Sequence, residues 1–140
     1  MKKTVICIVS TAAVFVLATA LNIQNMIWGG TPSVLGLVFS LVFCACLFVM
    51  PAVAKNRAFA VVSACYAAFS AIASTAGLLA VKGIISDTLA FVVVPPLTAF
   101  CGLSYIMNDY SVFYSVLIAF TLIAALNLIL TARKTAAAKA

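Results

Sequence analysis

The chain has 140 residues, of which 67% are hydrophobic and only 7% are charged, and its formal net charge is +6. A water-soluble domain of this length needs far more polar surface, so the composition predicts an all-α integral membrane protein. The basic residues flank apolar runs and form no dense patch with interleaved aromatic side chains. This pattern argues against a nucleic-acid-binding protein and makes the lipid bilayer the first partner.

The sequence also lacks the residues of several enzyme classes. It contains no histidine and no glutamate, so a histidine-based triad, a paired-glutamate site, a histidine-ligated haem and the common zinc sites cannot form. The five cysteines lie within apolar segments, without a C-x-x-C spacing, and we interpret them as small apolar side chains. We therefore expect no enzymatic activity, no cofactor and no metal.

The first apolar run covers residues 4–21 and follows Lys2 and Lys3. Its length favours an uncleaved transmembrane span, although Ala18-Thr19-Ala20 also fits the small-x-small pattern of a signal-peptide cleavage site. The uncharged residues 22–33 contain several turn-forming residues and are expected to form an extracytoplasmic loop. The alternative is that polar residues of this loop, including Asn22, line a vestibule.

The second span is predicted at residues 34–54, the most apolar stretch of the chain. Gly36 and Ser40 lie four residues apart on one small face, which suits close contact between helices. The basic loop Lys55-Asn56-Arg57 follows directly, and its charge predicts that it lies in the cytoplasm.

The third span is predicted at residues 58–81, which are rich in alanine and serine. Small side chains recur on one face at helical spacing, and packing between helices is the expected role of this stripe: Ala60, Ala64, Ala67 and Ala71. The hydroxyl groups of Ser74 and Thr75 either help this packing or line a pore.

A fifth hydrophobic segment, residues 84–109, is broken by Pro95 and Pro96. Proline lacks an amide donor and disfavours α geometry in the residue before it, so a continuous helix is not expected here. Each half is too short to cross the roughly 30 Å hydrocarbon core alone. The segment is therefore either a re-entrant hairpin, which enters and leaves the membrane on one side, or a fifth span kinked at the prolines.

The distribution of basic residues decides between these topologies. After the last span, residues 112–131, the tail 132–140 is basic, as are residues 2–3 and 55–57. The positive-inside rule places all three groups in the cytoplasm only if the number of spans is even. We therefore predict one bundle over residues 1–140, with four transmembrane helices, a re-entrant segment and both termini in the cytoplasm; the kinked fifth span is the alternative. Short loops and a lysine-rich start are typical of a bacterial inner membrane protein.

The broken segment supplies the candidate functional residues. Backbone groups freed inside a membrane must be buried in protein or line water. A helix beginning at Pro96 would direct the amides of Leu97, Thr98 and Ala99 at an anionic or dipolar substrate, or else nearby hydroxyls merely satisfy a structural kink. Asp87 is a candidate for ion coupling, with capping of its own helix as the alternative.

Two functions are compatible with this sequence. The first is a small homo-oligomeric channel or transporter with the Pro95-Pro96 break at its permeation site. The second is a non-catalytic accessory, regulatory or immunity protein that docks a larger membrane partner through small-residue helix faces. In size and span number the chain resembles the small multidrug-resistance transporters, but it lacks the glutamate in the first helix on which that family depends, so no residue role is carried over.

Overall fold

The computed structural model describes residues 2–86, 95–107 and 109–138, and this part of the chain is almost entirely helical. It contains the long helices α1 (Lys2–Trp28), α2 (Val34–Ala54), α3 (Arg57–Val81) and α5 (Tyr110–Ala137), together with the 3₁₀ helix η1 (Thr98–Tyr105). Each long helix has the length and composition of a membrane span. The prediction of an all-α membrane protein with four spans and a shorter, proline-broken segment is thus confirmed.

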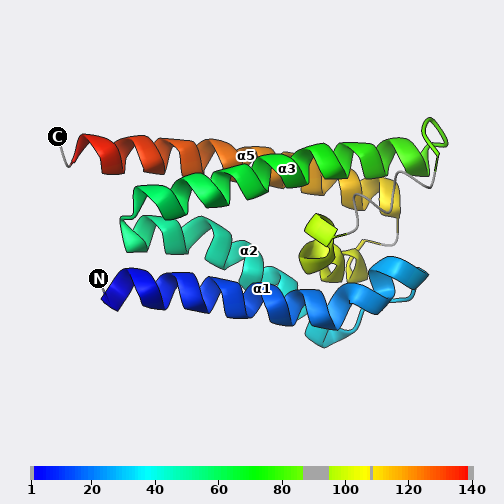
Figure 1. The fold of residues 1–140 in the computed structure, drawn as a ribbon. Coiled ribbons are helices and arrows are strands. Elements are labelled where there is room, and N and C mark those ends of the chain that lie inside the picture. The colour runs from blue at the N-terminus through cyan, green and yellow to red at the C-terminus, as the bar shows by residue number, and fades with distance from the viewer. Residues whose placement is uncertain (1, 87–94, 108, 139–140) are drawn as a thin grey trace.

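The path of the chain shows that the broken segment is re-entrant. The N-terminus and the C-terminus lie at the same end of the bundle, while α3 ends and α5 begins at the opposite end (Figure 1). The described residues between α3 and α5 therefore begin and end at the same end of the bundle. A fifth crossing would place the last residues of α5 at the other end, so the kinked span does not describe this fold.

Local sequence signals explain where three of the spans begin. The side chains of Ser33, Asn56 and Asp109 cap α2, α3 and α5, accepting hydrogen bonds from the backbone amides of Gly36 (3.0 Å), Phe59 (3.0 Å) and Ser111 (2.6 Å). Each cap satisfies an amide that the first helical turn leaves without a partner.

One expected boundary is wrong. The helix predicted to end near Leu21 continues to Trp28, so most of the loop assigned to residues 22–33 is helix. The polar residue Asn22 does not end the helix because its amide Nδ2 donates to the carbonyl of Ala18, 2.8 Å away in the same helix. The helix stops where Gly29 takes a positive φ of 69°, a conformation that glycine adopts at little cost. Whether residues 1–20 are retained in the mature protein stays a prediction.

The helices pack as two groups. Helices α3 and α5 lie side by side over most of their length, whereas α1 packs against α2 and both of these contact η1 (Figure 1). Contacts between the two groups are fewer. The re-entrant segment thus belongs structurally to the first two helices, although α3 separates it from them in the sequence.

The topology gives a first testable prediction. The described basic residues, with the exception of Lys82, lie in the parts of the chain at the end that holds both termini. We expect this end to face the cytoplasm. Fluorescent-protein fusions at either terminus should be bright, and alkaline phosphatase inserted at Gly83 should be active outside. Reporters that place the two termini on different sides would contradict the fold.

Candidate functional site at the re-entrant segment

The re-entrant segment approaches α2 at a pair of glycines. Gly102 of η1 lies against the backbone carbonyl of Gly36 in α2, and a Cβ atom at Gly102 would overlap this carbonyl and approach the Oγ of Ser40 to 2.6 Å. Gly102 and Ser40 are buried. In a membrane, where apolar surface gains little by leaving lipid, this close backbone approach is a main source of helix association.

A short relay of polar groups joins α1, α2 and the re-entrant segment. The Nδ2 of Asn22 donates to the Oγ of Ser40 at 3.2 Å, and this Oγ donates to the carbonyl of Ala99 at 2.7 Å. Asn22, Ser40 and Ala99 are all 0% exposed. The relay thus links two side chains to a carbonyl of η1 inside the bundle.

Asn22 also retains unused hydrogen-bonding capacity. Its Oδ1 is buried and has no hydrogen-bond partner among the described residues. The same oxygen lies against Gly36, where an added Cβ would collide with it. An unpaired amide oxygen in a buried position is costly, so Asn22 joins the candidate functional residues beside the broken backbone.

A second hydroxyl holds the start of the segment from the other group of helices. The Oη of Tyr66, on α3, donates to the carbonyl of Pro96 at 2.7 Å. Two nearby backbone carbonyls thus accept hydrogen bonds from different groups of helices: that of Ala99 from Ser40 of α2, and that of Pro96 from Tyr66 of α3. The re-entrant backbone is thereby connected to both groups of helices.

Aromatic rings fill the space around these two hydrogen bonds. Phe100 of η1 lies with its ring centroid 5.3 Å from Phe43 and 6.1 Å from Tyr66, and the cluster reaches every described helix through its members Phe15, Phe43, Phe48, Tyr66, Phe100 and Phe120. We call these six residues the aromatic cluster. Because they fill the centre of the bundle, they leave it packed rather than hollow.

The structure separates the residues that the sequence selected for permeation. Pro95 is exposed and Pro96 buried, and with Leu97 they form the helical turn that leads into η1, where Thr98 is 1% exposed. Of these four residues, Pro96 accepts the hydrogen bond from Tyr66 described above. Asp87 lies outside the described residues.

Ser74 and Thr75 have a different environment. Their hydroxyl groups donate to carbonyls within α3, from Ser74 to Ser70 at 2.7 Å and from Thr75 to Ala71 at 2.9 Å. This is the usual way for such hydroxyls to be satisfied inside a helix. Neither hydroxyl bonds to the described part of the re-entrant segment.

The small-residue stripe of α3 is buried inside the bundle. Its members are at most 7% exposed: Ala60, Ala64, Ala67 and Ala71. Farther along α3, Gly77 lies so close to the ring of Tyr114 on α5 that an added Cβ would be 2.5 Å from it. The small residues thus bring α3 close to its own neighbours and leave little of this face for an external partner.

A lateral groove adjoins the aromatic cluster. It lies between α1, α2 and α3, has a volume of about 280 Å³ and is almost entirely apolar. Its lining includes Phe15, Phe43 and Tyr66 of the cluster, with Thr11 and Ser63 as the other hydroxyl-bearing residues. A hydrophobic molecule entering here would touch the tyrosine that holds Pro96.

Asn22 and Tyr66 are not among the permeation or packing residues predicted from the sequence. Asn22 is predicted in a loop, with a vestibule-lining role as the alternative, and Tyr66 is not singled out. A signal was present, because both are hydrogen-bonding side chains inside apolar stretches, where polar groups need partners. Their partner could not be identified, since nothing in the sequence pairs α1 or α3 with residues 96–99.

Together these features define a class: a four-span membrane protein with a re-entrant helix held by side-chain hydroxyls. Comparison of the chain with protein-family models, with curated protein sequences and with solved structures gives no match.

Proposed function

We propose that this protein is a small membrane channel or transporter whose re-entrant segment forms the permeation site. The observation that carries the proposal is the short helical segment from Pro95 to Tyr105, which lies among the long helices and has two carbonyls, of Ala99 and Pro96, that accept hydrogen bonds from Ser40 and Tyr66. Straight helices would suffice for a purely structural bundle. A broken helix inside a membrane is the arrangement that ion and substrate sites of transporters use.

The packed centre limits how a pathway can form. The aromatic cluster closes the middle of a single subunit, so a substrate passes either along an axis between subunits or after the two groups of helices separate. The few contacts between the groups support the second route. In that mechanism the re-entrant segment moves with the group of helices to which it stays hydrogen-bonded, through Ser40 of α2 or through Tyr66 of α3. We place the protein in a bacterial inner membrane, with the basic end in the cytoplasm.

Flux measurements test this proposal. Proteoliposomes are loaded with potassium chloride and glycerol, and release is followed with ion-selective electrodes and by light scattering. We expect the wild type to release at least one solute faster than empty vesicles. Ser40→Ala and Tyr66→Phe each remove one hydroxyl, worth about 0.6–1.7 kcal/mol between membrane helices, and should slow release roughly three- to fifteenfold.

Matched controls separate the site from the fold. Ser115→Ala and Tyr110→Phe make the same chemical changes at exposed positions of α5 and should leave release unchanged. Release no faster than from empty vesicles, or the same rate in all four variants, would count against permeation through this segment.

One observation favours the accessory role as a second candidate. The groove between α1, α2 and α3 is apolar and uncovered, as a docking site for a partner helix would be. Ala12 is exposed and lines this groove, so Ala12→Phe would fill it without disturbing the core. A partner that co-purifies with the wild type and is lost from Ala12→Phe, while flux is absent from both, would establish this role instead.

A further inference from the structure

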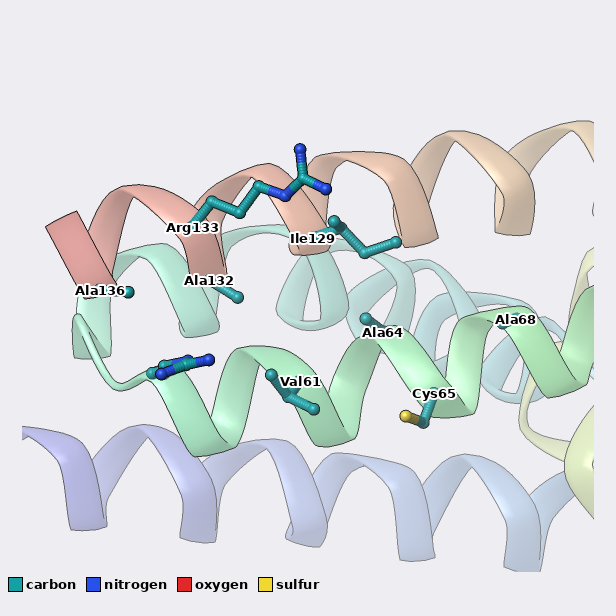
Figure 2. A pocket seen from close by; sticks show the side chains of 9 residues that line it. Val61, Ala64, Cys65, Ala68, Ile129, Ala132, Arg133 and Ala136 are labelled. Carbon is teal, nitrogen blue, oxygen red and sulfur yellow. The ribbon is translucent and has the colours of Figure 1, made fainter.

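A second groove lies between α3 and α5 at the end that holds the termini. Its volume is about 470 Å³ and its lining is mostly apolar, with a floor of small residues and walls that include Val61, Cys65 and Ile129 (Figure 2). Ala68 and Ala136 also line it. The groove runs along two membrane-spanning helices, so hydrocarbon is its natural surrounding.

Two arginines stand where this groove meets the membrane surface. Arg57 is the first residue of α3, and Arg133 lies near the end of α5; both line the groove and both are exposed. The only acid among the described residues is Asp109, which caps α5 at the opposite end of the bundle. Within the described chain, neither guanidinium has a carboxylate to pair with.

The side chain of Arg133 extends along α5 toward Ile129, away from the C-terminus (Figure 2). It therefore lines the groove and does not project beyond the end of the helix. A guanidinium without a carboxylate partner favours an anion, and its geometry matches that of a phosphate group.

We propose that this groove binds an anionic phospholipid, with its phosphate at the end formed by Arg57 and Arg133 and an acyl chain along the apolar walls. The apolar length of the groove distinguishes this ligand from free phosphate, which has no use for it. A second copy of the chain is a poor occupant because it would bring the same basic end to the same membrane surface. The inference does not depend on the proposed transport function.

Cys65 offers a local measure of occupancy. It is the one exposed cysteine of the chain, the other four being buried, and it lines the groove. N-ethylmaleimide should therefore label it selectively, with Cys65→Ser confirming the labelled position. In nanodiscs the acyl chains of either lipid can cover Cys65, but phosphatidylglycerol held by its phosphate should stay in the groove longer and so slow the alkylation of Cys65 relative to phosphatidylcholine.

Charge variants of the full chain test the role of the arginines. Each basic residue near an anionic surface contributes about a fivefold preference for anionic lipid. R57Q/R133Q should therefore need a roughly twentyfold higher phosphatidylglycerol concentration to protect Cys65. The control K2Q/K3Q removes the same charge at the same end of the bundle, from a helix that does not line the groove. In K2Q/K3Q the phosphatidylglycerol concentration that protects Cys65 should stay within twofold of the wild-type value. For each variant, the alkylation rate in phosphatidylglycerol is divided by the rate in phosphatidylcholine. This ratio removes any direct effect of the substituted charges on the reactivity of the thiol.

Three results would overturn the proposal. Equal losses in R57Q/R133Q and K2Q/K3Q would show attraction to general surface charge. Protection by sodium phosphate in nanodiscs of phosphatidylcholine would show an anion site without need of a lipid chain. Protection that depends on the number of protein copies per disc, and not on the headgroup, would show that a second copy covers the groove.

Discussion

Gly102→Ala is expected to detach the re-entrant segment from α2. The added methyl group would overlap the backbone carbonyl of Gly36, which cannot rotate away as the end of a side chain can. Forcing extra volume into such a contact costs about 1–3 kcal/mol, and here it also pulls the Oγ of Ser40 away from Ala99. A fluorogenic maleimide, which reacts as buried cysteines become exposed, should report a melting temperature well below that of the wild type in detergent.

A control at another glycine keeps this prediction specific. Gly83 has a positive φ of 70° and no atom within 4 Å of an added Cβ, and asparagine tolerates this conformation. Gly83→Asn should therefore melt close to the wild type. If Gly102→Ala also melted like the wild type, the segment could not lie as close to Gly36 as the structure has it.

Phe100→Ala should produce the second large effect. Phe100 is 0% exposed, and its ring contacts Phe43, Tyr66 and Phe120, which lie on three different helices. Removing a buried phenyl ring leaves a cavity in the place where the two groups of helices meet, and this costs roughly 3 kcal/mol or more. We expect a lower melting temperature by the same assay and, since the cluster closes the centre, faster release of potassium from proteoliposomes.

The same substitution on the outside of the bundle provides the comparison. Phe69 on α3 is 52% exposed, so its ring faces lipid rather than protein. Phe69→Ala should change stability by no more than about 0.5 kcal/mol and leave release unaltered. Equal effects of Phe100→Ala and Phe69→Ala would show that the ring of Phe100 does not join the helices.

The spans could be predicted from the sequence because their physical cause is local. An apolar run of sufficient length must become a helix in lipid, and the asymmetry of basic residues then sets the number of crossings. Even the re-entrant path followed from Pro95, Pro96 and the basic tail. The end of α1 was misjudged for an equally local reason, because Asn22 can bond to Ala18 in its own helix and so does not mark a turn.

The candidate site could be predicted only in part because its contacts are not local. The approach of Gly36 to Gly102 and the bond from Tyr66 to Pro96 join residues on segments that no sequence period relates. Gly36 and Ser40 were recognised as a contact face, but their partner, the re-entrant segment, was not. The packing of small residues is readable from spacing, whereas the choice of neighbour depends on the three-dimensional arrangement of all the helices.

The attachment of η1 to the two earliest helices has a consequence for biosynthesis. When α1, α2 and α3 have left the ribosome, the face of α2 that carries Ser40 has not yet received η1, and polar groups of Asn22 and Ser40 meet lipid. A nascent chain interrupted after Val81 would remain in this state. The polar contact between the two earliest helices and the re-entrant segment is therefore completed only after α3 has been made, so assembly of this part of the bundle waits for a later part of the chain.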